Sequence, residues 1–221
     1  MTLASRACGG FIFAARAPVR PRSSRAIQDL GEQRLRDMDA TGIDRQILSA
    51  HLACRVQVFD AATATSLAHS FNDQLAEAIR EHPDRYSGLT AVAPQDPQAA
   101  AKEIERGATH LGLKGVIISS HTLGEYLDDE KYWDIFAAAE AFNAPICIHP
   151  NTPSRGLIGP MLERGLESAI YGFAVETGMH LLAIITSGAF DRFPQLQIIV
   201  GHAGERCRTG CIASTTCTVP P

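Results

Sequence analysis

Two histidines follow short apolar runs, and their type and spacing point to metal chemistry. The run Pro145-Ile-Cys-Ile ends in His149 and Pro150, and the run Leu196-Gln-Ile-Ile-Val ends in Gly201 and His202. Continuous apolar runs bounded by turn-forming residues are typical of strands that are buried on both faces of a sheet. Neutral imidazole is a common ligand of divalent metals. The sequence therefore predicts that His149 and His202 bind a metal ion together.

Such a site requires neighbouring parallel strands, and the middle of the chain has the pattern that builds them. Helical and strand-like segments alternate between residues 28 and 205. Helices are predicted over residues 29–41, 61–81, 97–112, 130–142 and 160–190. Strands are predicted over residues 44–49, 86–93, 115–119 and 145–149, and before His202.

This alternation is the signature of βαβ units, so we expect an α/β fold with a parallel sheet. A doubly wound sheet and a β/α barrel both fit it. No glycine-rich phosphate loop follows any predicted strand, which weakens the nucleotide-binding version. Polar residues follow successive strands instead: Ser119-Ser120-His121, then His149, then His202 with Glu205. Barrel enzymes build their sites at the carboxyl ends of their strands, so the pattern favours a (β/α)8 barrel.

Composition bounds the class of protein. With 221 residues, of which 45% are hydrophobic, the chain can bury a sizeable core as one domain. A formal net charge of -4 provides no basic surface for nucleic acid. No apolar run is long enough to cross a membrane.

The six cysteines form no CxxC pair, so we expect reduced thiols and a cytoplasmic location. A zinc site made of Cys207, Cys211 and Cys217 is disfavoured because their spacing is irregular and a fourth ligand is missing.

Both ends of the chain differ in composition from the middle. Residues 1–27 contain five arginines and no acidic residue, which superficially resembles an organellar transit peptide. Residues 206–221 also lack acidic residues and show no periodicity. We therefore expect an aberrant, disordered N-terminal segment over residues 1–27, a β/α-barrel fragment over residues 28–205, and a non-native tail over residues 206–221.

Seven segments of the middle region carry a family resemblance. They are Asp29-Leu-Gly-Glu-Gln-Arg-Leu-Arg-Asp-Met-Asp-Ala-Thr-Gly-Ile-Asp44, Val92-Ala-Pro-Gln-Asp-Pro97, Gly112-Leu-Lys-Gly115, Ile148-His-Pro-Asn-Thr152, Val175-Glu-Thr-Gly-Met-His-Leu181, Phe190-Asp-Arg-Phe-Pro194 and Gly201-His-Ala-Gly-Glu205. In this order they resemble the amidohydrolase superfamily. More narrowly, they are similar to the metal-dependent, non-oxidative decarboxylases of 5-carboxyvanillate, γ-resorcylate and aminocarboxymuconate semialdehyde, and most similar to the first.

The resemblance implies a fold and a set of site residues. The fold is a (β/α)8 barrel of the amidohydrolase type, with its first and last strands missing or aberrant in this chain. His149 and His202 are implied ligands of a divalent metal, zinc or manganese, from the fifth and sixth strands. Glu205 is the implied catalytic partner beside substrate and water, and Arg25 aligns with an arginine that pairs with the substrate carboxylate. We also expect a homo-oligomer, as in intact members of the family.

The resemblance also implies the chemistry. The metal acts as a Lewis acid and a template that holds the carboxylate and the adjacent hydroxyl of a small aromatic acid. The ring carbon is then protonated and carbon dioxide leaves. His121 is a candidate catalytic residue that reaches the substrate from the fourth strand, and a solvated loop histidine is the alternative. His180 is predicted to be packed within a helix. Surface positions are predicted for His51, His69, His82 and His110.

The tail after Glu205 departs from the family's pattern. A nucleotide string that encodes residues 205–219 reads, in another frame, as Ala-Leu-Pro-Tyr-Trp-Leu-Tyr-Arg-Leu-Asp-Tyr-Met-His-Arg, which matches the family's continuation. We therefore expect a single-base deletion near codon 205, and a decarboxylase that is impaired or inactive. Two alternatives stay open. One is a hydrolase or lactonase of the same superfamily, and the other is a non-catalytic fragment that associates with an intact homologue.

Overall fold

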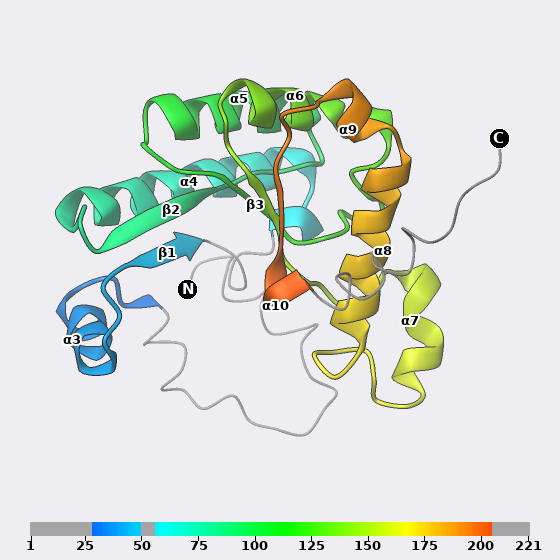
Figure 1. Ribbon diagram of the computed structural model, residues 1–221, viewed down its shortest axis with the longest axis horizontal. Coiled ribbons are helices and arrows are strands. Elements are labelled where there is room, and N and C mark those ends of the chain that lie inside the picture. Colours follow the sequence, from blue (N-terminus) through cyan, green and yellow to red (C-terminus); the bar gives the residue numbers. More distant parts are fainter. Residues whose placement is uncertain (1–27, 50–55, 205–221) are drawn as a thin grey trace.

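The chain folds around a parallel sheet whose strands follow one another in sequence order. The structure, a computed structural model, describes residues 28–49 and 56–204 (Figure 1). The described residues form a sheet of five strands: β1 (Gln46–Ser49), β2 (Tyr86–Ala91), β3 (Val116–Ile118), β4 (Ile146–Ile148) and β5 (Ile198–Val200). Each strand pairs in parallel with the next, in the order β1-β2-β3-β4-β5.

This order decides between the two architectures that the sequence allows. A doubly wound sheet reverses its strand order at a switch point, whereas a barrel adds each strand beside the previous one. The order of the described strands contains no reversal. The prediction of an α/β fold with barrel-type strand order is therefore confirmed over these five consecutive strands.

Helices precede, connect and follow these strands in the described residues. They are α3 (Glu32–Thr41), α4 (Ala61–Glu81), α5 (Pro97–Thr109), α6 (Trp133–Ala141), α7 (Arg155–Leu162), α8 (Gly172–Thr186), α9 (Ala189–Arg192) and α10 (Gly201–Gly204), with 3-10 turns η1 (Val56–Val58) and η2 (Glu130–Tyr132). No helix in the described part of the chain is long and apolar enough to cross a bilayer.

Helix α4 has the bounds that the sequence predicts, and its ends show why. The side chain of Asp60 accepts a hydrogen bond from the Thr63 N–H at 3.0 Å, which caps the first turn. The helix ends just before Pro83, a residue that cannot continue it. Helix α5 begins at the predicted Pro97, where the side chain of Asp96 caps the Ala99 N–H at 3.0 Å.

Alternate residues of the central strands face two environments. Val116 and Ile118 of β3 and Ile146 and Ile148 of β4 are buried in one cluster with apolar residues of α5, α6 and α8. Figure 1 shows α4, α5 and α6 running along this side of the sheet. Successive side chains of a strand point to opposite faces. The residues between these four therefore face away from the α5 and α6 layer.

The opposite face of the sheet, here called the inner face, is also apolar. Ile117, Cys147 and Ile199 are paired in register across β3, β4 and β5, and alternation places Ile47 and Leu89 on the same face. Ile117 is buried, but Ile47 of β1 is 69% exposed and Ile199 of β5 is 47% exposed. The inner face is therefore covered at its centre and open at its two edge strands.

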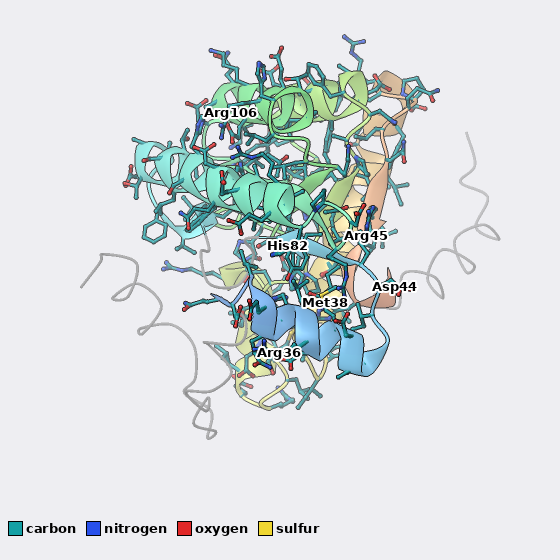
Figure 2. The ribbon with its side chains drawn as sticks, turned by 90° about the vertical axis from the view of Figure 1, so that its left-hand side faces the viewer. Arg36, Met38, Asp44, Arg45, His82 and Arg106 are labelled. Carbon is teal, nitrogen blue, oxygen red and sulfur yellow. The ribbon has the colours of Figure 1, made fainter. Side chains whose placement is uncertain are left out.

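Helix α3 packs on the molecule through one buried residue, Met38. Figure 2 shows Met38 on the side of α3 that faces the rest of the molecule and Arg36 on its outer side. The helix ends at Gly42, where a φ of 70° demands the left-handed conformation that glycine adopts without strain. Arg85, just before β2, donates to the Asp44 carbonyl at 2.8 Å and so ties this end of the molecule to the sheet.

One predicted element is corrected by the structure. Residues 160–190 do not form a single long helix: they include the end of α7, all of α8 and the start of α9, with turns between them. Gly165 and Gly188 interrupt the region with φ values of 64° and 85°, which a right-handed helix cannot contain. Pro160 lies inside α7 rather than at a helix start. The segment boundaries expected at 1–27 and 206–221 fall outside the described residues.

Candidate functional site

The structure brings the two predicted metal ligands together. His149 directly follows β4, and His202 lies in α10, which directly follows β5. Because Ile148 and Val200 are partners in register, the chain leaves both strands at the same level of the sheet. The imidazole centroids lie 5.1 Å apart with an angle of 86° between the rings. Two adjacent strands thus deliver two imidazoles to one point at their carboxyl ends.

The environment of His149 sets its protonation state. Its Nδ1 lies 2.8 Å from the Pro150 carbonyl oxygen. A carbonyl can only accept, so Nδ1 carries the proton and the lone pair is on Nε2. Burial lowers the pKa of His149, opposed by the bond to Pro150 and assisted by the nearby His202. A neutral imidazole with its lone pair on Nε2 is the form that coordinates a metal.

His202 has an unusual backbone. Its φ is 48°, in the left-handed region that a residue with a side chain rarely occupies. The preceding Gly201 must be a glycine, since a Cβ there would lie 2.9 Å from Cδ of Pro150. The Phe173 ring of α8 lies 6.2 Å from the His202 ring. Conformations of this kind occur at sites where the side chain must point in one direction.

His121, the candidate catalytic residue after β3, connects two loops of this face. Its Nδ1 accepts a hydrogen bond from the Gly124 N–H at 3.0 Å. Its Nε2 therefore carries the proton and donates to the Thr152 carbonyl at 3.1 Å. Both ring nitrogens are thus engaged within the protein, and the ring ties the loop after β3 to the loop after β4. Glu205 and Arg25, the other two predicted site residues, lie outside the described residues.

Sequence reasoning missed a buried polar network next to these loops. The carboxylate of Glu176 in α8 accepts hydrogen bonds from Ser120 Oγ at 3.1 Å, Tyr126 OH at 3.0 Å and the Ser154 N–H at 3.2 Å. Glu176 is fully buried. The only signal in the sequence is its place in the motif Val175-Glu-Thr-Gly-Met-His-Leu181, which gives the residue no role.

His180, predicted to be packed within a helix, is fully buried in α8 beside this network. The Leu127 N–H donates to its Nε2 at 3.1 Å, so its proton is on Nδ1, which lies 3.2 Å from Ser120 Oγ. Burial, with a smaller effect of His121, lowers the pKa of His180 to about 3. Ser120, His180 and Glu176 have the residue types of a hydrolase triad. However, a ring that donates to Ser120 cannot act as the base that activates it.

Two glutamine side chains form a second set of hydrogen bonds, which hold the loops nearer to β1 and β2. Gln57 of η1 accepts from the Ser119 N–H at 2.7 Å and donates to Thr122 Oγ1 at 2.8 Å. Gln95, after β2, donates to the Val56 carbonyl at 2.8 Å. These side chains connect the segments after β1, β2 and β3. The loops of the site-bearing end are therefore linked to one another by buried or half-buried hydrogen bonds.

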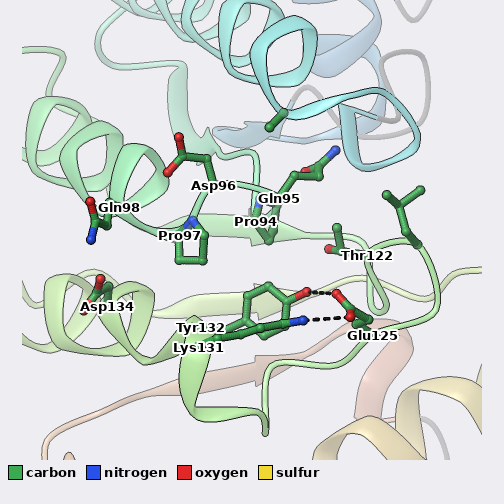
Figure 3. Close-up of a pocket in the computed structure, with 12 residues that line it drawn as sticks. Pro94, Gln95, Asp96, Pro97, Gln98, Thr122, Glu125, Lys131, Tyr132 and Asp134 are labelled. Atoms are coloured by element: carbon green, nitrogen blue, oxygen red, sulfur yellow. Dashed lines mark hydrogen bonds and ion pairs between the residues drawn. The ribbon is translucent and has the colours of Figure 1, made fainter.

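A cavity of about 510 Å³ opens beside the loops that follow β2 and β3 (Figure 3). Its wall contains Glu125, which binds Lys131 Nζ at 2.7 Å and accepts from Tyr132 OH at 2.7 Å. These bonds, the one from Lys131 first, lower the pKa of Glu125. His121, His149 and His202 do not line this cavity. In its wall Lys131 and Glu125 are paired with each other.

The donors present fit part of a metal site. His149 and His202 provide two imidazoles at one point. No group of three or more histidine, cysteine, aspartate or glutamate side chains suited to a metal ion occurs in residues 28–49 and 56–204. Protein metal sites use three or four protein ligands. Among the described residues, His149 and His202 are thus two of the ligands that such a centre needs.

Known proteins share this sequence and fold. The family model described as Amidohydrolase matches residues 16–206. A γ-resorcylate decarboxylase of Polaromonas sp. (strain JS666) is 31% identical over 201 residues, which cover 84% of this chain and 59% of that protein. The chain thus spans little more than half the length of this relative.

Solved structures also resemble this chain in sequence and fold. The 5-carboxyvanillate decarboxylase of Novosphingobium aromaticivorans, with bound manganese and a nitrobenzoic acid, is 48% identical with a TM-score of 0.83, over 89% of this chain and 57% of that chain. A dihydroxybenzoic acid decarboxylase of Polaromonas sp., with manganese and 2-nitroresorcinol, is 30% identical with a TM-score of 0.85, over 93% of this chain and 66% of that chain. With its parallel sheet in sequence order and its paired histidines at the strand ends, the chain belongs to the amidohydrolase family.

Proposed function

We propose that this chain carries the metal-binding part of a non-oxidative decarboxylase that acts on an aromatic carboxylic acid. The observation that supports this most directly is the approach of the His149 and His202 rings to 5.1 Å at the ends of adjacent strands. The relatives with known reactions are decarboxylases, and two of them are solved with manganese. We therefore assign His149 and His202 to a divalent metal, manganese or zinc.

The residues of the chain have distinct tasks in this proposal. His149 presents Nε2 because its Nδ1–H is bound to the Pro150 carbonyl, and burial keeps its ring neutral. His202 is directed toward His149 by its left-handed backbone and by the close packing of Gly201 on Pro150. His121 holds the loop after β3 against the loop that follows His149. Glu205 and Arg25 are proposed to contact the substrate beside this centre.

The reaction breaks the bond between the ring carbon and the carboxyl carbon and forms a C–H bond at that ring carbon. It involves no change of oxidation state, so a proton donor and a means of withdrawing electrons suffice. A bound divalent metal supplies Lewis acidity and orients the carboxylate and a neighbouring hydroxyl. The protein positions the imidazoles that hold it.

The substrate class follows from the relatives and from this chemistry. Identity is 48% to the 5-carboxyvanillate decarboxylase and 30% to a structure of 2,6-dihydroxybenzoate decarboxylase with its substrate. Both of these acids have a hydroxyl next to the carboxylate that is lost. We propose an ortho-hydroxylated benzoic acid as substrate, with 5-carboxyvanillate as the first compound to test.

The test combines metal binding with turnover. The full chain is mixed with manganese, and binding is followed by the electron paramagnetic resonance of the unbound ion. Carbon dioxide release is measured with 5-carboxyvanillate and with 2,6-dihydroxybenzoate. We expect His149→Ala and His202→Ala to weaken manganese binding by at least about tenfold. The matched control is His110→Ala, an exposed histidine at the end of α5, which leaves binding unchanged.

Two results would contradict the proposal. One is manganese binding that is the same in His149→Ala and the unaltered chain. The other is carbon dioxide release that is the same in His149→Ala and the unaltered chain. A chain that binds manganese through these histidines but releases no carbon dioxide would be the inactive decarboxylase that the sequence predicts, or the lactonase or non-catalytic alternative.

A further inference from the structure

The segment that follows the first proposed ligand is held at three points. Asn151 Nδ2 lies 3.4 Å from the Ser119 carbonyl. The carbonyl of Thr152 accepts from His121 at 3.1 Å. The Ser154 N–H donates to Glu176 at 3.2 Å. Two of these partners belong to the loop after β3, and the third belongs to helix α8. Residues 150–154 therefore bridge a strand end and a helix that are far apart in sequence.

The third of these contacts, the hydrogen bond from the Ser154 N–H to Glu176, is buried. The Tyr126 hydroxyl lies 3.0 Å from Ser154 Oγ and 3.0 Å from Glu176 Oε2, so it joins the loop to the carboxylate from a second side. Ser154 and Glu176 are both buried. A buried carboxylate is costly unless donors compensate for its lost hydration. Here the Ser120 hydroxyl, the Tyr126 hydroxyl and the Ser154 N–H supply three such donors.

The hydrogen bonds of this network have fixed donors and acceptors. The Leu127 N–H donates to His180 Nε2, His180 Nδ1–H faces Ser120 Oγ, and the Ser120 hydroxyl donates to Glu176. Each proton thus has one arrangement that satisfies all partners. Fully satisfied buried networks of this kind make a local structure rigid and unique. Ser120 also has a φ of 41°, so its position is held against backbone preference.

We propose that Tyr126 and Glu176 are positioning residues for His149. They do not contact the metal. They anchor Ser154 to helix α8, and this fixes the segment whose Pro150 carbonyl holds the His149 ring in one tautomer. Residues that orient a ligand in this indirect way commonly change metal affinity by tenfold or more when they are replaced. The inference deepens the proposed function and rests on it for the assignment of His149 as a ligand.

The chain offers matched controls for both residues. Tyr132 is also buried, and its hydroxyl donates to Glu125 at 2.7 Å in the wall of the cavity. Glu103 is 2% exposed, and it binds Asn72, Arg106 and His69 between α4 and α5. Asn72 in turn holds the Ala91 N–H of β2 at 2.8 Å. Tyr132→Phe and Glu103→Gln therefore remove the same groups from sites that do not contact residues 150–154.

The experiment compares Tyr126→Phe and Glu176→Gln with these two controls in the full chain, without metal. Amide exchange is measured at Ser154 and at Ala91, and nitrogen chemical shifts report the tautomer of His149. In Tyr126→Phe and Glu176→Gln, we expect the amide of Ser154 to exchange about tenfold faster relative to the amide of Ala91, and a second tautomer of His149 to appear. In Glu103→Gln, we expect the amide of Ala91 alone to exchange faster. Manganese binding, measured next, should weaken about tenfold in the first pair alone.

A general loss of stability would accelerate all amides together and leave the His149 tautomer unchanged, and that result would overturn the inference. Unchanged Ser154 exchange in a folded Tyr126→Phe variant would overturn it too. If Glu176→Gln fails to fold, Tyr126→Phe decides alone, since it removes only a hydroxyl. If the unaltered chain does not bind manganese, the metal assignment is rejected, while exchange and tautomer still decide whether the two residues position His149.

Discussion

At the scale of the residue, burial makes two histidines neutral, but only one of them is disposed to bind a metal. The pKa values of both His149 and His180 are lowered, in each case mainly by burial. His180 uses both ring nitrogens inside the protein, toward Ser120 and Leu127. His149 binds the Pro150 carbonyl through Nδ1. His180 is therefore a structural histidine, whereas His149 is a candidate ligand because its ring lies beside that of His202 at the ends of adjacent strands.

His180 should make the stability of the protein depend on pH. Its pKa is about 3 in the folded state and about 6.5 in an unfolded chain. Between these values the unfolded state binds a proton that the folded state does not, so stability falls as the pH falls from 6.5 toward 3. The contribution of one such group approaches about 1.4 kcal/mol per pH unit. Urea unfolding measured at intervals from pH 7 to pH 4 would show this slope.

The control for this prediction is His180→Asn, which cannot titrate and whose amide takes the place of Nδ1 beside Ser120. We expect a lower stability at pH 7 and a shallower dependence on pH below 6.5. The carboxylates of the chain contribute to the slope in both proteins, so the difference between the two curves is the quantity of interest. Parallel curves would show that His180 titrates alike in the folded and unfolded states.

Sequence alone could predict the paired histidines but not the network that supports them. His149 and His202 stand at the ends of apolar runs, and parallel strands deliver such residues to a common edge. Glu176 and Tyr126 carry no comparable signal, because their roles depend on Ser154 and Ser120 at distant places in the chain. The tether formed by His121 is likewise a property of loop contacts and not of spacing.

At the scale of the element, the sequence predicts a helix well where the residues that begin and end it stand next to it in the sequence. Asp60 and Pro83 bound α4, and both are visible in the sequence. The prediction failed for residues 160–190 because a glycine can lie within a helix or break it, and Gly165 and Gly188 adopt the left-handed backbone that breaks it. Strand β3 is shorter than predicted, since pairing stops at Ile118 where Ser119 and Ser120 begin the site loop.

Two helical glycines should respond in opposite ways to alanine. Gly107 of α5 lies against the buried Thr90 of β2, and a Cβ there would penetrate the Thr90 side chain. A Cβ added at Gly156 of α7 would meet nothing within 4 Å. Alanine gains about 1 kcal/mol of helix propensity over glycine, whereas overpacking costs about 1–3 kcal/mol. Gly107→Ala should therefore lose stability in urea unfolding, and Gly156→Ala should gain up to about 1 kcal/mol.

The pair tests whether α5 must approach β2 as closely as the structure shows. An increase in stability for Gly107→Ala would mean that the helix can move away from Thr90 at little cost. A loss for Gly156→Ala would mean that α7 needs the flexibility of glycine for another reason, since the backbone there is right-handed helix and the position is exposed.

At the scale of the whole molecule, the order of the strands determines where the chemistry sits. A sheet built in sequence order brings every strand-to-helix loop to the same end, which is why residues after β3, β4 and β5 meet. The same order leaves β1 and β5 as the two edges of the sheet in the described part of the chain. Both edge strands expose an isoleucine on the inner face, Ile47 and Ile199.

An exposed apolar face on edge strands promotes association. We therefore expect the chain to sediment at micromolar concentration as species larger than its 23.8 kDa monomer, and the double variant Ile47→Lys and Ile199→Lys to shift the distribution toward the monomer. Ile170→Lys is the control, because Ile170 is 74% exposed but lies between α7 and α8, away from the sheet. If this control dissociates the assembly and the double variant does not, association occurs through the helical side, and the open inner face is not the surface that drives it.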